Sequence, residues 1–390
     1  MKLSHSLIAA ALTSTLVLSA CSNDDEPDDT ATSTTEDGSG ASGGASGDGA
    51  DATGDAADQT GDTADETGDV ADQTGDTAGE TEDAAGETDD AGADEALTAA
   101  LGIDEADTWA KDLLTTAMES TQLDGKEATE LREKAFAGAE LEAQRAAGLL
   151  EAVTGKPAEW DAEESPIDFQ VLAISKSGER GPGLVLVQSI PEEGNPVLSL
   201  IARQKDREQF RIVWQGQMLS GTSIGEFERR SVGSGKFMLD EDEGLVASPK
   251  EVLDDLAAYL SFPNEGESPD IKTNGYAPAV REQAQQQAND VSVQADFTQT
   301  HELGDQQVHT LELADGSALT FAVLDRTSVF DVYDGMELTP PDSFWYFTRD
   351  RSITEEATLH TSAFVALHIP TDGQPEVIAA REQIVDSEGD

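Results

Sequence analysis

Residues 22–96 cannot build a hydrophobic core, because they contain 25 Asp or Glu, no Lys or Arg, no aromatic residue and a single Val. A degenerate seven-residue repeat runs through the segment, seen in Thr53-Gly54-Asp55, Thr60-Gly61-Asp62, Thr67-Gly68-Asp69 and Thr74-Gly75-Asp76. The repeat does not predict a coiled coil, since it offers no apolar seam and each Gly disfavours helix by about 1 kcal/mol. Low hydrophobicity with charge of one sign predicts a disordered acidic linker over residues 21–97.

The predicted linker has the composition of a spacer. A Gly-rich coil of this length spans about 50 Å, and repulsion between its carboxylates extends it further. Loose binding of divalent cations and glycosylation of the Thr residues are the alternatives. The plain spacer is favoured because it requires only the composition.

The charge of the whole chain excludes several classes of partner. The formal net charge is −57, from 80 acidic and 23 basic residues. Direct binding to DNA, RNA or an anionic lipid surface requires clustered Lys and Arg, which this balance opposes. A single Cys excludes a disulfide framework and a cysteine-based zinc site.

The N-terminus indicates where the protein is located. The apolar run at residues 7–18 rises about 18 Å as a helix, too short for a hydrocarbon core of about 30 Å. Together with Lys2 it is typical of a signal peptide over residues 1–20. The tetrad Leu18-Ser19-Ala20-Cys21 resembles the bacterial lipobox, which implies cleavage before Cys21 and attachment of diacylglycerol and an acyl chain such as palmitate there. We expect a membrane-anchored lipoprotein on the extracytoplasmic face; the alternative is a secreted protein with one unrelated cysteine.

A first folded module is predicted over residues 98–247. Apolar residues at helical spacing predict a helix over 105–118, and Trp109 is expected to pack in the core of the module. A second helical stretch runs from Asp124 to Val153 and is expected to bend near Gly138. The period then changes to two and predicts four short antiparallel strands, near residues 167–173, 184–187, 197–201 and 210–214.

A second module, over residues 248–390, repeats this order. Ser248-Pro249-Lys250-Glu251 is a strong helix start, and another helix is expected over 277–290. Asp315-Gly316 and Asp372-Gly373 predict hairpin-type turns. Strands are expected near residues 296–302, 308–313, 318–324, 358–369 and 377–385.

The two halves share short matching segments. Phe136-Ala137-Gly138-Ala139 corresponds to Tyr276-Ala277-Pro278-Ala279, and Asp168-Phe169 corresponds to Asp296-Phe297. The predicted fold class is therefore α+β, with two similar helix-plus-antiparallel-sheet modules of the cystatin or nuclear-transport-factor-2 kind. Such rolls often leave a pocket between sheet and helix.

Several features together resemble a family of actinobacterial lipoproteins that carry a domain of unknown function. They are the lipobox, the acidic linker, the helix from Trp109 to Leu114, Phe136-Ala137-Gly138 and the segment Ser223-Ile224-Gly225-Glu226-Phe227. The resemblance covers residues 98–387. It implies a surface-anchored α+β body and supplies no site residues.

One segment matches a catalytic motif. Gly221-Thr222-Ser223-Ile224-Gly225 fits the G-x-S-x-G pattern of a nucleophile elbow, which works only where a parallel strand turns sharply into a helix. Here a meander strand precedes the motif and a charged, Gly-rich stretch follows it, so an exposed loop is the favoured interpretation. Gly233-Ser234-Gly235-Lys236 lacks the spacing of a phosphate-binding loop. No catalytic residue is assigned, and a serine hydrolase at Ser223 is the alternative.

No metal or cofactor is expected. Four histidines lie in the second half, namely His301, His309, His360 and His368. His360 and His368 would lie about 26 Å apart on one strand, so a metal would have to pair histidines across strands. Asp240-Glu241-Asp242-Glu243-Gly244 lacks the alternating spacing of a calcium loop.

The strongest candidate for an interaction patch is the run Phe344, Trp345, Tyr346 and Phe347. If extended, the run places two rings on each face of a strand. Packing between the two modules is the favoured interpretation, and an exposed binding patch is the alternative.

These observations predict a non-enzymatic binding or interaction module. We expect its partner to be an envelope protein or a cell-wall component. A transporter-linked solute-binding lipoprotein is the second possibility, although the alternating βαβ units of such proteins are missing.

Overall fold

The computed structural model describes residues 99–155, 167–177, 183–191, 194–203, 209–235, 237–238, 244–264, 266–305, 308–348 and 352–390. The predicted signal peptide, Cys21, the acidic linker and the acidic run Asp240–Glu243 lie outside the described residues. Within the described part, no helix is long and apolar enough to cross a membrane.

The described part opens with the helices α1 (Ile103–Gln122), α2 (Gly125–Ala135) and α3 (Gly138–Thr154). α1 forms where its apolar stripe predicts it and buries that stripe. The bend predicted near Gly138 is a complete break, because Phe136 and Ala137 are extended. The Ala137 N–H donates to the Ile212 carbonyl at 3.0 Å, which holds the break against a strand.

Two helices begin the second half, α4 (Pro249–Leu260) and α5 (Tyr276–Val291). The predicted start of α4 is confirmed, since Ser248 is the N-cap and its Oγ accepts the Glu251 N–H at 3.2 Å. The apolar face of α4 is buried against the sheet described next.

Ten strands form in the described part, each close to a predicted position except the short β5. They are β1 (Phe169–Ile174), β2 (Leu184–Ser189), β3 (Val197–Arg203), β4 (Phe210–Met218), β5 (Phe237–Met238), β6 (Ala295–Leu303), β7 (His309–Glu312), β8 (Ala318–Val332), β9 (Glu356–Ile369) and β10 (Glu376–Gly389). Two single-turn 3-10 helices, η1 (Arg230–Val232) and η2 (Phe344–Tyr346), lie between them.

All ten strands join one antiparallel sheet, in the order β1-β2-β3-β4-β10-β9-β8-β7-β5. β6 and β7 both pair with β8, β7 with its first part and β6 with its second. They therefore act as one interrupted strand along the same edge of β8. In the described part, β1–β4 joins the second half through the β4–β10 ladder, which contains two residue pairs, Ala379–Met218 and Ala380–Gln217.

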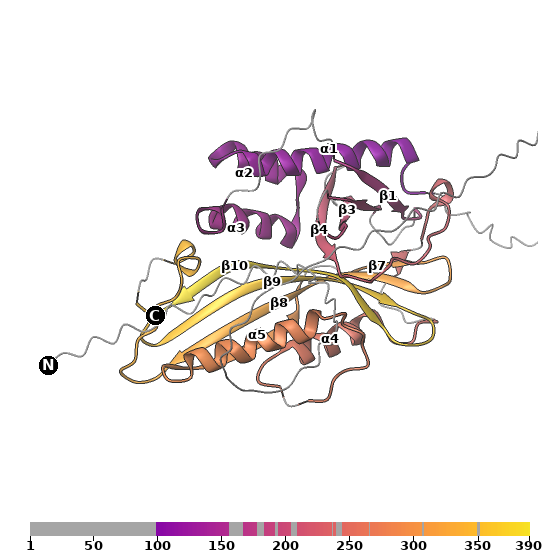
Figure 1. Cartoon of the computed structure of the whole chain (residues 1–390). Helices are drawn as coiled ribbons and strands as arrows, with labels where there is room; N and C mark the ends of the chain where they lie inside the picture. Colours follow the sequence, from indigo (N-terminus) through magenta and orange to yellow (C-terminus); the bar gives the residue numbers. More distant parts are fainter. Residues whose placement is uncertain are drawn as a thin grey trace, which may run out of the picture. The chain divides into compact units, whose positions relative to one another are not determined.

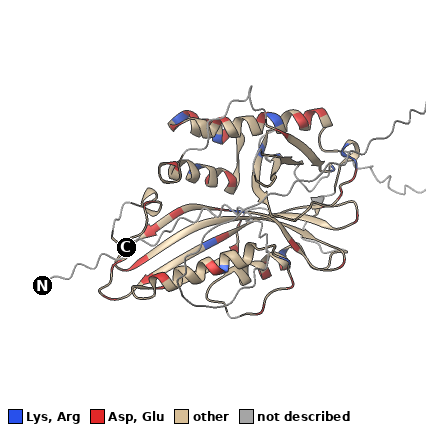
Figure 2. Cartoon of the chain, viewed as in Figure 1, with Lys and Arg blue, Asp and Glu red and all other residues tan. Residues whose placement is uncertain are grey.

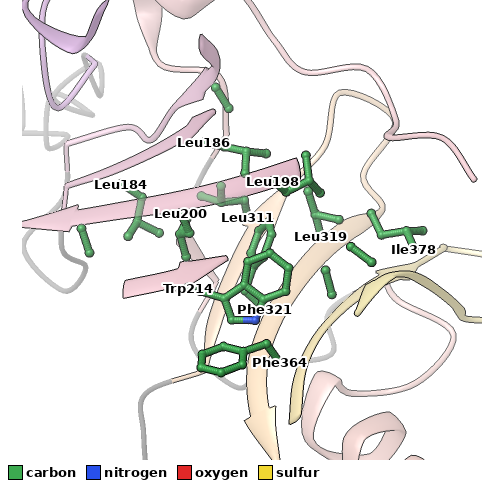
Figure 3. Close-up of a cluster of buried hydrophobic side chains, with 14 of the residues drawn as sticks. Leu184, Leu186, Leu198, Leu200, Trp214, Leu311, Leu319, Phe321, Phe364 and Ile378 are labelled. Carbon is green, nitrogen blue, oxygen red and sulfur yellow. The ribbon is translucent and has the colours of Figure 1, made fainter. Parts of the chain in front are cut away.

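The sheet folds over at this narrow joint, so each half has one face toward the other. Between them lies a hydrophobic cluster that we call the central core; its largest members are Leu184, Leu198, Leu200, Trp214, Leu319, Phe321 and Phe364 (Figure 3). α1 covers the outer face of β1–β4. α4 and α5 cover the outer face of β8–β10 (Figure 1).

Trp214 reaches the central core because of a β-bulge. The register between β3 and β4 shifts at this point, where Ile201 pairs with Ile212 and Leu200 pairs with Trp214. The extra residue Val213 places Ile212 under α1 and Trp214 on the opposite face. The Trp214 indole N–H then donates to the Ala322 carbonyl in β8 at 3.0 Å, and its ring meets Phe321 edge-on.

A buried ion pair connects the halves beside the joint. Glu140 of α3 is fully buried, and its Oε2 accepts hydrogen bonds from Arg381 of β10 at 2.6 Å and from the Gln215 N–H of β4 at 3.1 Å. α3 contacts both of these strands. Glu140 is therefore held in the interior by donors from both halves.

The predicted α+β class with an antiparallel sheet is confirmed. The sequence did not predict that the strands of both halves form a single sheet. Nor did it predict that both halves share one core. This arrangement follows from the pairing of β4 with β10, two segments about 160 residues apart in the chain.

Candidate binding site

The central core opens into a pocket of about 660 Å³, which we call the loop pocket. One wall consists of the start of β1 and the end of β2, and the other is the irregular segment after β4. The residues used below are Gln170, Leu172, Gln188, Asn195, Met218, Ser220, Ser223, Ile224, Phe227, Glu228, Arg229 and Arg230. A pocket of this size accommodates a small organic molecule or a few residues of peptide.

The segment that forms one wall follows β4 directly and is fixed to the second half of the sheet by hydrogen bonds. The Leu219 N–H and the Thr222 hydroxyl both donate to the Ile378 carbonyl of β10, at 2.8 and 2.9 Å. The Ala314 N–H, in the turn between β7 and β8, donates to the Glu226 carbonyl at 2.8 Å. The wall is therefore irregular in backbone shape and at the same time firmly held.

Both glycines of the G-x-S-x-G match serve this backbone path. Gly221 has φ of +79°, a conformation that disfavours residues with a Cβ. A Cβ on Gly225 would lie 2.7 Å from Leu313 Cδ1 of the central core. Their presence is explained by the loop itself and does not require a nucleophile elbow.

Ser223 lies exposed in this loop, in a context unlike that of an activated serine. The preceding strand, β4, is antiparallel to both of its neighbours, and residues 219–229 form no helix after it. No histidine is among the described residues that line the loop pocket. The strand-turn-helix arrangement that the motif requires is therefore not formed at Ser223.

The second glycine-rich segment closes the edge of β1. The Ser234 N–H donates to the Ile174 carbonyl at 2.7 Å, and its Oγ accepts the Ile174 N–H at 3.1 Å. The Lys176 N–H donates to the Gly235 carbonyl. These bonds give residues 233–235 a structural role, while Lys236 lies outside the described residues.

The lining of the loop pocket divides into an apolar floor and a polar rim. Leu172, Ile224 and Phe227 pack against the central core, to which Met218 belongs, and form the floor. The rim carries amide, hydroxyl and guanidinium groups. An apolar surface with a few polar groups at its mouth is the arrangement most often found in ligand sites.

The rim carries two arginines, Arg229 and Arg230, on a chain with 80 acidic and 23 basic residues. Figure 2 shows acidic residues spread over the helices and strands of the described part. The carboxylate of the rim, Glu228, is paired with Lys176 at 2.6 Å. Arg230 donates to the Val171 carbonyl at 3.0 Å, and its nearest carboxylate, Asp107, lies at 3.9 Å. Arg229 is exposed and has no carboxylate within 4.0 Å in the described part of the chain.

The aromatic run has a different structure from the one expected. It forms the 3-10 helix η2, not a strand, with Phe344 buried, Trp345 and Phe347 half-buried and Tyr346 43% exposed. Phe344 and Trp345 pack in a cluster whose members all belong to the second half of the chain. The prediction that the run packs between the two modules is therefore wrong. Tyr346 is the ring left open to solvent, and a binding role for this run stays a prediction.

The four histidines do not gather at a metal site. No group of three or more His, Cys, Asp or Glu in the described residues could hold a metal ion. His368 Nε2 lies 3.1 Å from the Ser317 hydroxyl, and His360 Nδ1 lies 3.5 Å from the Thr327 hydroxyl. His301 and His309 are both buried.

A buried polar network, which the sequence did not reveal, lies under α5. Arg326 of β8 and Glu382 of β10 form an ion pair at 2.7 Å, and each side chain is 2% exposed. The Tyr276 hydroxyl donates to the other Glu382 oxygen at 3.1 Å, and burial raises the pKa of Tyr276 well above its usual value. His301, the cross-strand neighbour of Arg326, has no hydrogen-bond partner on either ring nitrogen among the described residues.

Burial lowers the pKa of His301 to about 3, with a further contribution from Arg326, and lowers the pKa of His309 to about 4. Both rings are therefore neutral in the folded protein at pH 7. In the unfolded chain a histidine titrates near pH 6.5, so below that pH the unfolded state binds protons that the folded state does not. The contribution of these two histidines to the free energy of unfolding is fully present above about pH 6.5 and is lost as the pH drops toward 4.

We predict that His301→Gln flattens this dependence. The free energy of unfolding of the unmodified chain should fall by about 1.4 kcal/mol per pH unit for each of the two histidines between pH 6 and 5. Urea unfolding across pH 5–7 measures the slope above the range where most carboxylates titrate. His301→Gln should remove about half of the histidine contribution, and the double variant with His309→Gln nearly all of it. An unchanged slope in the double variant would show that neither ring is held neutral.

Comparison with known proteins identifies no relative of this chain. No family model matches it, and neither a curated protein nor a solved structure does. The resemblance to actinobacterial lipoproteins therefore stays a prediction from the short motifs.

Proposed function

We propose that this protein is a membrane-anchored extracytoplasmic lipoprotein whose folded body binds a ligand in the loop pocket. The lipid on Cys21 would hold it to the cell membrane, and residues 21–97 would carry the body outward. Membership of the actinobacterial family with a domain of unknown function belongs to the same proposal.

The observation that carries this proposal is the loop pocket itself. It combines an apolar floor continuous with the central core, a polar rim, and a wall held by hydrogen bonds to Ile378 and Ala314 of the second half. A firmly held site of this kind favours binding, because little ordering is required when the ligand enters. Ser223 supports catalysis poorly, since no histidine lines the pocket in the described part and Glu228 is paired with Lys176.

The size of the pocket keeps the solute-binding alternative open. A pocket of about 660 Å³ suits a small solute as well as a segment of a protein or wall polymer. In the solute-binding case the partner would be a transporter, and the captured species would be small.

We further propose that the two halves are repeats of one cystatin-like unit, with modules at 98–247 and 248–390. In the first, α3 precedes the antiparallel meander β1–β4; in the second, α5 precedes the interrupted strand β6/β7 and then β8, β9 and β10. Of the matched residues, Phe136 lies in the break just before α3, and Tyr276 is the first residue of α5. The element order and these positions support duplication.

Replacing the lipidation residue tests the anchor. Cys21→Ser removes the only thiol in the chain, so acylation and cleavage at this position cannot occur. We expect radiolabelled palmitate to be incorporated into the unmodified protein and into a Ser22→Ala control but not into Cys21→Ser. Equal labelling of all three chains would contradict the anchor.

Photo-cross-linking in the intact envelope tests the binding function. A photoreactive amino acid at Ser220, on the rim of the loop pocket, should capture one dominant species. The same residue placed at the exposed Thr298 of β6, which does not line the pocket, is the matched control.

A protein or glycan adduct specific to position 220 supports the interaction module, and a small adduct supports the solute-binding form. Identical weak adducts at both positions would show that the loop pocket is not the binding site.

A further inference from the structure

We propose that the loop pocket recognises a carboxylate attached to an amide-containing, apolar ligand, such as an N-acylated amino acid or the C-terminal end of a peptide. This inference rests on the proposed binding function and specifies its ligand class. Three parts of the pocket carry it, namely Arg229 together with the partly used Arg230, the free rim acceptors and the apolar floor.

The cationic part is left uncompensated by the protein. Each guanidinium has five N–H donors. Within the described part, Arg229 donates none of them to a hydrogen-bond partner, and Arg230 donates one, to the Val171 carbonyl. The separation of 3.9 Å between Arg230 and Asp107 exceeds hydrogen-bond distance.

Three lysines of the described part, unlike Arg229, have a close acidic partner. Lys176, Lys250 and Lys272 each pair closely with an acidic residue. In a chain with 80 acidic residues, two neighbouring arginines at the mouth of a pocket without a close carboxylate leave room for an anion from outside. A guanidinium binds a carboxylate through two parallel hydrogen bonds, which makes the carboxylate the favoured anionic group.

The polar rim supplies acceptors and donors next to the arginines. Gln170 and Ser223 form no side-chain hydrogen bonds in the described part, and the Gln188 side chain donates weakly to Met218 Sδ, leaving its carbonyl oxygen free. The Asn195 amide nitrogen is already used by Met218 and Ser220, so its oxygen remains as an acceptor. Free carbonyl oxygens of this kind accept N–H groups, as a ligand amide would provide.

The floor determines the rest of the ligand. Leu172, Ile224, Phe227 and Met218 present apolar surface continuous with the central core. An acyl chain or an apolar side chain would bury this surface on binding, which is favourable by about 25 cal/mol per Å². A small inorganic anion would leave the floor exposed and gain only the contacts at the rim.

The test compares two molecules that differ only in charge, N-octanoylglycine and N-octanoylglycinamide. Isothermal titration uses the processed chain, residues 21–390, with Cys21→Ser, which carries neither the signal peptide nor the lipid and needs no detergent. We expect the acid to bind at least tenfold more tightly than the amide, equivalent to about 1.4 kcal/mol. Arg229→Gln should abolish that preference, whereas Lys126→Gln, at a side chain that is 89% exposed on α2, should preserve it.

Equal binding of acid and amide, or a preference that survives Arg229→Gln, would overturn the assignment of a carboxylate and leave the pocket as a binding site. If neither molecule binds, the photo-cross-linking from position 220 is repeated in the chain that also carries Arg229→Gln. Loss of the captured species supports the anionic ligand, and unchanged capture overturns it. No capture with either chain would instead reject the binding function.

Discussion

Burial of apolar side chains between the two halves of one folded sheet is the interaction on which the rest of the structure depends. Leu200 and Trp214 from the first half meet Phe321 and Phe364 from the second in the central core. Backbone pairing between β4 and β10 is confined to two residue pairs, so side-chain packing must supply most of the cohesion between the halves. The outer helices then cover the two faces that this packing leaves exposed.

The candidate site follows from the same packing. The loop pocket lies beside the central core, and the segment after β4 forms one of its walls. Its bonds to the Ile378 carbonyl and to Ala314 fix it to the second half, while Leu172 and Gln188 come from the first. The described lining of the loop pocket therefore comes from the first half, and the second half holds one of its walls in place.

Local signals in the sequence predict the elements well. The Ser248 cap, the stripe of α1 and the alternation in β6 each depend on neighbours within a few residues. The joint between β4 and β10, the bulge that turns Trp214 inward and the pair Arg326–Glu382 depend on pairings between distant segments, which no local pattern encodes.

The candidate site shows the same division. The motif around Ser223 lies in the loop that forms one wall of the proposed site, but its glycines serve the backbone path and do not form a nucleophile elbow. Arg229 and Arg230 were indistinguishable in sequence from other surface cations. Their selection as candidate ligands of an anion depends on the absence of a close carboxylate in the described part of the fold.

Hydrogen exchange of the full chain carrying Trp214→Ala tests the shared core most directly. Truncation of a buried tryptophan costs about 3–5 kcal/mol, and the site lies in the first half of the sheet. If both halves depend on one core, amides of β2 and of β9 should lose the same amount of protection. Loss confined to β1–β4, with β8–β10 unchanged, would show that the halves fold as independent units and would contradict a central core that holds them together.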